Sequence, residues 1–140
     1  MTVMISGGFD PLHVGHLDLI EDAHEYGDVM VALNSDQWLV NKKGYCLMSW
    51  AERAHILSAL KDVDKVVSVD DVDGTVCHAL EKYRPHYFAN GGDRNMANIH
   101  EHEVCNKFGI IELFGIGGGK TRSSSEIIKK VINDNNSRSI

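Results

Sequence analysis

The sequence predicts an α/β fold: a single Rossmann-like, doubly wound domain whose five-stranded parallel sheet has helices on both faces. Short, uninterrupted apolar runs recur along the chain, as is typical of strands buried on both faces. Segments with helical spacing separate these runs, and such alternation favours a parallel sheet. Because 140 residues suffice for one hydrophobic core, we expect one domain over residues 1–132 and a flexible polar tail over 133–140.

Three of the expected strands lie in the first half of the chain, at Val3–Ile5, Asp28–Asn34 and Val63–Val69. A helix is expected from Gly15, where apolar residues take up a helical spacing. A second helix begins at Ser49 and Glu52, which have the spacing of a capping box. Between the second strand and this helix we expect a polar loop that contains Gly44 and the two lysines before it.

Two more strands are expected in the second half, at His86–Asn90 and Gly109–Phe114. Asp73 or Thr75 can cap the helix that precedes the fourth strand, and residues 98–108 are expected to form the helix before the fifth. A last helix is expected from Ser123, which has the capping-box spacing to Glu126.

Two histidines stand directly after the first strand. The loop Ser6–Pro11 contains two glycines and a proline, and His13 and His16 follow it on the first turn of the expected helix. The N-terminus of a helix offers unpaired amides and a positive dipole end, which suit phosphate. Imidazoles three residues apart share one helix face there. The pattern therefore predicts a phosphate site.

Two further polar loops are expected beside the histidines. Ligands of open parallel sheets bind beyond the carboxyl ends of the strands, where the strand order reverses. With the order 3-2-1-4-5, the loops after strands one, four and five meet there. Asn90–Arg94 is glycine-rich and is either a ligand contact or a simple turn. Thr121–Ser125 offers three serines and Arg122 to phosphate, although plain helix capping by Ser123 is the alternative.

Other motifs are excluded by spacing. Gly117–Thr121 is not a P-loop, because Phe114 occupies the position where that motif requires glycine. A dinucleotide motif fails because Lys120 stands where its third glycine belongs. His100 and His102 are two residues apart in a helical stretch, so they face apart and no metal site is expected.

Composition narrows the class of protein. A formal net charge of −6 argues against a nucleic-acid partner. No apolar run approaches 18 residues, so neither a membrane span nor a signal peptide is expected. The three cysteines are widely spaced and are expected to be free thiols in a reducing cytoplasm. Several lysines and arginines lie in or near the candidate loops, which indicates a small anionic ligand.

Two motifs resemble those of the cytidylyltransferase-like nucleotidyltransferases. Gly8–His16 is similar to the first motif of that family, and Thr121–Ile128 to its second, serine- and threonine-rich motif. The resemblance covers nearly the whole chain and includes Lys43 and Arg53. Arg122 before the serines is similar to the glycerol-3-phosphate cytidylyltransferases, although a Gly-Ile pair between them is lacking.

A second branch of the family shares a different feature. Gly91, Gly92 and Asp93 after the fourth strand resemble the adenylyltransferases that make ADP-heptose. Because the chain mixes features of both branches, the donor base and the acceptor stay open.

The resemblance implies nucleotidyl transfer, in which an acceptor phosphate attacks the α-phosphorus of CTP or ATP and pyrophosphate leaves. It implies Mg²⁺ bound with the triphosphate, a phosphorylated small molecule as acceptor, and a homodimer. The implied catalytic residues are His13, His16, Lys43 and Arg122. The candidate nucleotide-binding residues are Ser6, Gly7, Gly8, Phe9, Asp10, Asn90, Gly91, Gly92, Asp93, Ser123 and Ser124. The candidate acceptor-binding residues are Lys43, Arg53 and Arg94.

Two other classes of function are weighed against this one. A non-catalytic nucleotide-binding module would keep the glycines and lose His13, His16 or Arg122, yet the chain has all of them. An interaction domain similar to a response regulator would need clustered acids, and Asp10 alone does not form such a cluster.

Overall fold

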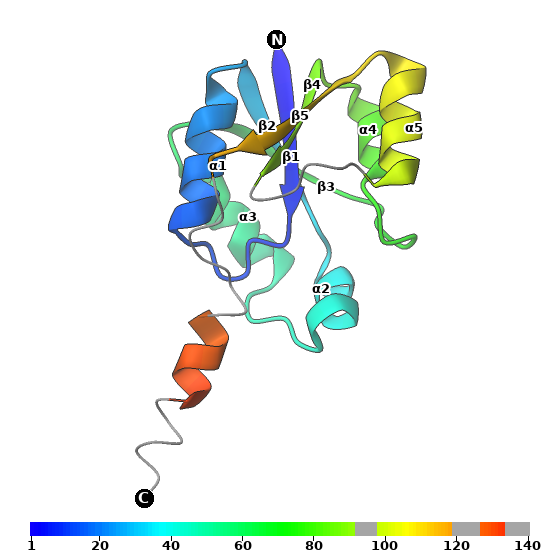
Figure 1. Ribbon diagram of the computed structural model, residues 1–140. Coiled ribbons are helices and arrows are strands. Elements are labelled where there is room, and N and C mark those ends of the chain that lie inside the picture. The colour runs from blue at the N-terminus through cyan, green and yellow to red at the C-terminus, as the bar shows by residue number, and fades with distance from the viewer. Residues whose placement is uncertain (92–97, 119–126, 134–140) are drawn as a thin grey trace, which may run out of the picture.

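Five parallel strands form one sheet in the computed structural model, which describes residues 1–91, 98–118 and 127–133 (Figure 1). Their order is β3-β2-β1-β4-β5, and each neighbouring pair is parallel. The predicted fold class and strand order are therefore confirmed. The strands are β1 (Thr2–Gly7), β2 (Asp28–Leu33), β3 (Val63–Ser68), β4 (Tyr87–Gly91) and β5 (Ile111–Ile116).

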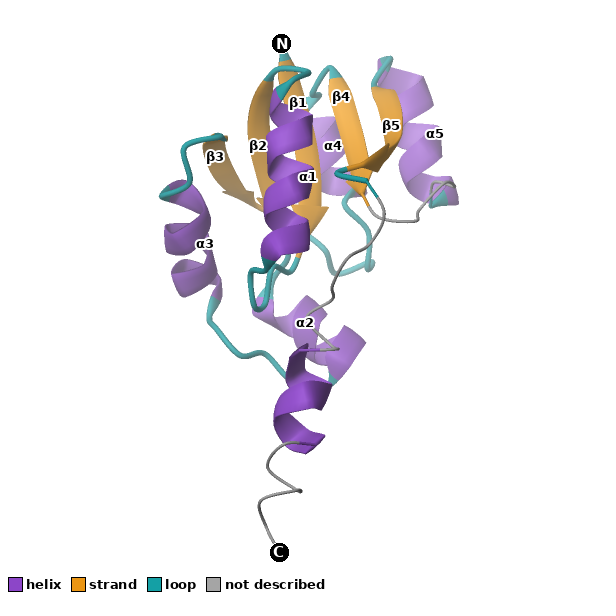
Figure 2. Cartoon of the chain, turned by 60° about the vertical axis from the view of Figure 1, so that its left-hand side comes forward, coloured by secondary structure: helices purple, strands orange, loops and turns teal. Residues whose placement is uncertain are grey.

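Helices cover both faces of the sheet, as Figure 2 shows. One face carries α1 and α3, and the other carries α4 and α5. A further helix, α2, lies beyond the carboxyl ends of the strands (Figure 1). The helix bounds are α1 (Val14–His24), α2 (Asp36–Lys43), α3 (Trp50–Ser58), α4 (Cys77–Tyr83) and α5 (Ile99–Phe108).

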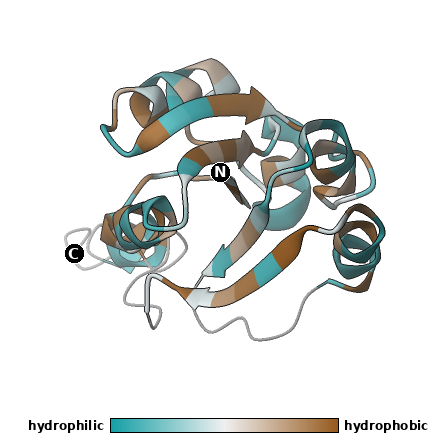
Figure 3. Ribbon diagram, turned by 90° about the horizontal axis from the view of Figure 1, so that it is seen from above, coloured by the Kyte–Doolittle hydropathy of each residue, from teal (hydrophilic) through white to brown (hydrophobic). Residues whose placement is uncertain are grey.

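The two halves of the core explain why the strand sequences are continuously apolar. Successive side chains of a strand point to opposite faces, so Val3 and Ile5 pack with α1 and α3, while Met4 packs with α4 and α5. Viewed along the strands, the sheet lies between two layers of helices whose exposed faces are more hydrophilic (Figure 3). No helix in the described part of the chain is long and apolar enough to cross a bilayer.

The prediction of a polar loop between the second strand and Ser49 is wrong, because residues 36–43 form α2. The Ser35 hydroxyl accepts from the Trp38 amide at 3.1 Å, and Gly44 ends the helix in the left-handed conformation at φ 85°. These are ordinary start and stop signals. The sequence carries no amphipathic signal for α2, because its apolar residues Trp38, Leu39 and Val40 are consecutive and only Leu39 is buried.

Smaller shifts affect the starts of α4 and β5. The helix α4 begins after Val76, one residue beyond the expected cap, although the Thr75 hydroxyl does accept from the Cys77 amide at 3.2 Å. Strand β5 begins later than expected because Gly109 is the left-handed C-cap of α5, at φ 68°. Residues 127–133 are helical, whereas the predicted capping box at Ser123 lies outside the described residues.

Candidate active site at the carboxyl ends of the strands

The two histidines build the N-terminus of α1. His13 is the N-cap, and its Nδ1 accepts from the Gly15 amide at 3.1 Å. His16 reaches back, and its Nδ1 accepts from the His13 amide at 3.2 Å. Their rings stack with centroids 3.7 Å apart and planes 22° apart. A capping box usually uses a serine or threonine and a glutamate or glutamine, so imidazoles in both positions are unusual.

These hydrogen bonds determine which nitrogen of each ring carries the proton. A ring nitrogen that accepts from an amide has no hydrogen of its own, so each neutral imidazole is protonated at Nε2. Each ring therefore has one N–H donor, at Nε2, in addition to the nitrogen that accepts from the backbone. The N-terminus of α1 therefore combines two imidazole donors with the helix dipole, an arrangement that stabilises negative charge.

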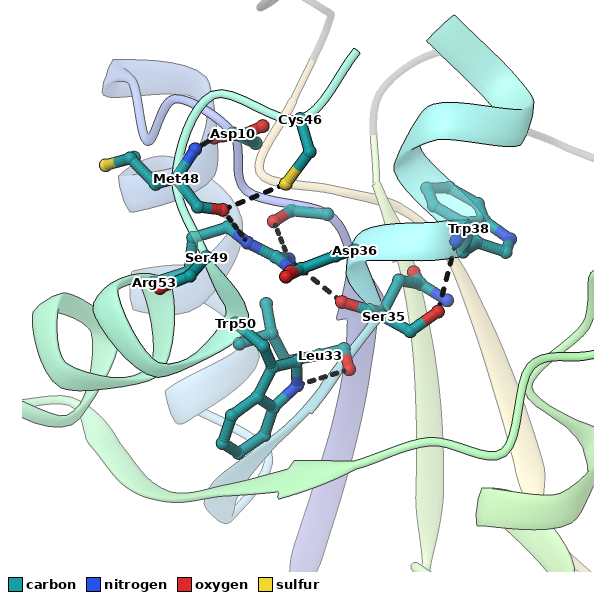
Figure 4. Close-up of polar contacts among 12 residues, drawn as sticks. Asp10, Leu33, Ser35, Asp36, Trp38, Cys46, Met48, Ser49, Trp50 and Arg53 are labelled. Atoms are coloured by element: carbon teal, nitrogen blue, oxygen red, sulfur yellow. Dashed lines mark hydrogen bonds and ion pairs between the residues drawn. The ribbon is translucent and has the colours of Figure 1, made fainter. Parts of the chain in front are cut away.

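Asp10 acts on the loop before α1 from within the protein. Its side chain is fully buried, and its two carboxylate oxygens accept from the amides of Leu47 at 2.7 Å and Met48 at 3.0 Å. The carboxylate thus joins the loop to the segment between α2 and α3 (Figure 4). The resemblance implied that Asp10 orients the loop, and this geometry supports that role instead of direct contact with a nucleotide.

Phe9 connects the same loop to the histidines. Its ring is buried and meets the His16 ring edge-on, with centroids 4.7 Å apart. Its backbone adopts φ 49°, in the left-handed region that residues other than glycine rarely occupy. Such conformations persist where the surrounding contacts enforce them and cluster at ligand-binding loops.

The structure contradicts the expectation that Arg53 reaches an acceptor phosphate. The side chain is 1% exposed, and its guanidinium is enclosed by protein oxygens (Figure 4). It donates to the carbonyls of Gly8 at 2.8 Å, Asn34 at 2.9 Å and Met48 at 2.9 Å. It also pairs with the Asp36 carboxylate at 2.6 Å. These loop carbonyls need a buried donor, and Arg53 supplies it from the first turns of α3.

Asn90 and Gly91 bring β4, β5 and α1 together at the carboxyl end of the sheet. The Asn90 side chain is buried, and its Nδ2 donates to the Leu113 carbonyl at 3.3 Å, where the β4–β5 register shifts. A Cβ at Gly91 would lie 3.1 Å from Leu19 Cδ1 and 3.3 Å from the Ile116 carbonyl oxygen. Both residues therefore contribute to packing between elements, and the backbone of β5 uses one N–H of the Asn90 side-chain amide.

The chain leaves β5 in direct contact with α1. The Gly117 amide donates to the Asp22 carboxylate at 3.0 Å. A Cβ at Gly117 would lie 2.9 Å from both the Cα and the backbone nitrogen of Leu19, so only glycine allows this approach. Gly117 thus lies against the helix that carries the histidines, while the expected phosphate-binding segment Thr121–Ser125 lies outside the described residues.

The remaining candidate residues divide into two groups. Ser6 and Gly7 end β1, and Lys43 is the last residue of α2, which flanks the same edge of the sheet. Six others lie outside the described residues, namely Gly92, Asp93, Arg94, Arg122, Ser123 and Ser124. Within the described ranges, no group of three or more His, Cys, Asp or Glu side chains is arranged to hold a metal ion.

A family model described as cytidylyltransferase-like matches residues 4–130. The chain belongs to the cytidylyltransferase-like family. This domain is also 37% identical over 135 residues to the bifunctional protein HldE of Geobacter sulfurreducens, covering 94% of this chain and 27% of that protein. HldE of Geobacter metallireducens is 38% identical over 134 residues, covering 93% and 26%. The chain thus spans about a quarter of the length of these curated relatives.

Solved structures share the fold of this cytidylyltransferase-like domain. The lipopolysaccharide core biosynthesis protein from Thermoplasma volcanium superimposes with a TM-score of 0.73 at 23% identity, covering 86% of this chain and 98% of that one. A protein of unknown function from Archaeoglobus fulgidus gives 0.61 at 19% identity, with coverage of 88% and 96%. The predicted family is confirmed by the family model and the HldE relatives, while these structures support the fold alone.

Sequence reasoning missed the supporting residues of the site. Asp71 is buried and accepts from Asn34 Nδ2 at 3.1 Å, from the Ser35 amide at 2.8 Å and from the Ser35 hydroxyl at 2.7 Å. It thereby holds the start of α2 against the β3–α4 loop. No local pattern signals this contact, because its partners are 36 and 37 residues away in the chain.

Proposed function

We propose that this domain is a nucleotidyltransferase that transfers CMP from CTP, or AMP from ATP, to a small phosphorylated acceptor such as glycerol 3-phosphate. The observation that carries the proposal is the pair of Nε2–H donors that His13 and His16 present at the N-terminus of α1. Membership of the cytidylyltransferase-like family supports the same reaction class.

The chemistry needs positioning and charge stabilisation more than covalent catalysis. An oxygen of the acceptor phosphate forms a bond to the α-phosphorus, and the bond from that phosphorus to the bridging oxygen breaks. The electron pair leaves with pyrophosphate. The attacking oxygen is already ionised, so no side chain has to remove a proton from it. Hydrogen bonds from His13 and His16 would stabilise the negative charge that grows on the transferring group.

Other residues are proposed for the remaining charges. Lys43, at the end of α2, would bind a phosphate of the donor or the acceptor. Arg122, Ser123 and Ser124 would hold the β- and γ-phosphates, and Arg94 would contact the acceptor. Mg²⁺ would arrive with the triphosphate and be held mainly by its oxygens and by water, because Asp10 at this edge is buried and engaged with backbone amides.

The donor base is proposed to be read by backbone groups of the loops that follow β1 and β4. The hydrogen bond from Asn90 Nδ2 to the Leu113 carbonyl supports this proposal, since the backbone of β5 already uses one of the two N–H donors of that side chain. CTP is the proposed donor. The alternative is ATP with a heptose-type sugar 1-phosphate, which is consistent with the similarity to the bifunctional HldE proteins. A homodimer in the cytoplasm is part of the proposal.

The decisive experiment measures pyrophosphate release. Purified protein is incubated with Mg²⁺, each nucleoside triphosphate in turn, and a panel of phosphorylated polyols and sugars. We expect release that depends on one triphosphate and one class of acceptor, with the diphosphate-linked product detected by mass spectrometry. Tight triphosphate binding without pyrophosphate release under every pairing would instead assign the chain to the non-catalytic nucleotide-binding modules.

A further inference from the structure

Arg53 is a buried charged side chain that the proposed reaction does not use. Four hydrogen bonds join its guanidinium to three segments far apart in the chain: the loop after β1, the junction of β2 and α2, and the segment before α3. Since a guanidinium has five N–H donors, one is left beyond these four contacts. At 1% exposure the group has no open path to a ligand.

The contact with Gly8 determines the orientation of one peptide in the loop before the histidines. Because the peptide is planar and trans, a Gly8 carbonyl that points to Arg53 directs the Phe9 amide to the opposite side. Phe9 is also the residue with φ 49°, and its ring lies against His16. Arg53 therefore sets the backbone of the loop at the residue that contacts the histidine pair.

Asp10 provides a second connection between the loop after β1 and the segment before α3. The Arg53 guanidinium donates to the Met48 carbonyl. The Asp10 carboxylate accepts from the amides of Leu47 and Met48. The peptides on both sides of Met48 are thus held from the loop side and from α3. This segment begins after Gly44, the C-cap of α2.

Attraction of a substrate phosphate by its positive charge does not explain why Arg53 is present at this position. Its guanidinium pairs with Asp36 at 2.6 Å, so the pair contributes little net charge to the crevice. A direct phosphate ligand would leave part of its fork exposed to the ligand, as bidentate phosphate contacts require.

We propose that Arg53 is a positioning residue for nucleotidyl transfer: its buried guanidinium holds the Gly8–Phe9 peptide and the segment before α3 in the geometry that binds the triphosphate. This inference rests on the proposed function. Arg53 acts through the loop and touches neither substrate.

The test compares Arg53→Lys with Asp36→Asn. Lysine keeps the charge but loses the planar fork that reaches three carbonyls, so the loop is released. Displacement of reacting groups by about 1 Å costs about 10²-fold in rate, and we expect a loss of that order in kcat together with weaker triphosphate binding by calorimetry. The Michaelis constant for the acceptor should stay near that of the wild type. Asp36→Asn leaves the three carbonyl contacts in place and should behave like the wild type in all three measurements.

Two results would overturn the proposal. If Arg53→Lys raises the Michaelis constant for the acceptor and leaves the triphosphate affinity unchanged, Arg53 contacts the acceptor directly. If Arg53→Lys has a lowered melting temperature but wild-type kinetic constants, Arg53 contributes only to the stability of the fold. If Arg53→Lys does not fold, Asp10→Asn weakens the second connection and should reproduce the loss of kcat and of triphosphate affinity in milder form, and unchanged values there would count against the proposal.

The proposed function and the inference fail separately. Absence of pyrophosphate release by the wild type would count against nucleotidyl transfer. Calorimetry with the Mg²⁺-triphosphate alone would then decide the inference, and equal affinities of the wild type and Arg53→Lys would reject it.

Discussion

His16 has two roles, a structural one at the start of α1 and a proposed catalytic one, and a single substitution would remove both. Its Nδ1 accepts from the His13 amide and so stabilises the start of α1, while its Nε2–H is the proposed donor to the transferring group. The structural role needs only an acceptor at this position, which glutamate supplies in ordinary capping boxes. The catalytic role needs a donor, which a carboxylate lacks.

A comparison of His16→Ala with His16→Glu separates these roles. We expect alanine to cost about 1 kcal/mol of stability through loss of the cap and about 10²–10³-fold in kcat through loss of the donor. Glutamate should recover the stability but not the activity, since it accepts from the amide and repels the triphosphate. Urea unfolding and steady-state rates measure the two effects. Activity that returns with glutamate would leave His16 with a capping role alone.

Cys105 predicts how stability depends on alkaline pH. Burial raises the pKa of this thiol to about 12, and nearby carboxylates act in the same direction. An unfolded cysteine has a pKa near 8.5, so above about pH 9 the unfolded chain loses a proton that the folded chain keeps. The contribution of the buried thiol to stability is therefore full below that range and decreases as pH rises toward 12.

Cys105→Ala provides the comparison for this prediction. The variant should be less stable at pH 7, because it leaves a small cavity, but its stability should decline less steeply between pH 8 and 10. Urea unfolding at a series of pH values measures both slopes. Parallel slopes would show that the thiol ionises equally in the folded and unfolded chains.

At the scale of elements, the contact between β5 and α1 depends on a glycine. Gly117 and Gly118 both have positive φ, at 86° and 78°, so an L-residue at either position is strained. A Cβ at Gly117 would also meet the backbone of Leu19 at 2.9 Å, whereas one at Gly118 would meet none of the described residues within 4 Å. The two positions therefore separate backbone strain from a steric clash.

Gly118→Ala is expected to cost about 1 kcal/mol, the usual penalty for a left-handed L-residue. Gly117→Ala should cost clearly more, because α1 and the β5 terminus must move apart. It should also weaken triphosphate binding, since the residues proposed to hold the β- and γ-phosphates follow Gly117 closely in the chain. Denaturant unfolding and calorimetry would test this. Equal losses of stability in the two variants would mean that α1 moves away from a Cβ at position 117 without a cost in free energy.

The elements differ in how far the sequence predicts them. Runs such as that of β2 are buried on both faces and have no other explanation than a central strand. The helix α2 escaped prediction because it lies outside the sheet and buries little. The histidine pair could be placed at the start of α1 from local signals alone. Arg53 could not, because the three carbonyls that enclose it become neighbours only in the folded chain.

For the whole molecule, ligand binding should appear as thermal stabilisation. A ligand at 100 times its dissociation constant adds about 2.7 kcal/mol to the folded state, roughly 10 °C in melting temperature for a domain of this size. We expect the Mg²⁺ complex of one triphosphate, CTP or ATP, to raise the melting temperature more than the other does. Addition of EDTA should remove most of the increase. Equal, small shifts with every triphosphate would argue against a specific nucleotide site.

The tie between Asp10 and the segment before α3 also has a consequence for motion. Leu47 is 49% exposed and lies outside any helix or strand, a setting in which amide hydrogens normally exchange with solvent within seconds. Its amide, like that of Met48, is nevertheless bonded to a fully buried carboxylate. Both amides should therefore exchange as slowly as those of the sheet, and Asp10→Asn should accelerate them. If so, this side of the crevice is already ordered before a nucleotide enters, and binding does not have to freeze it.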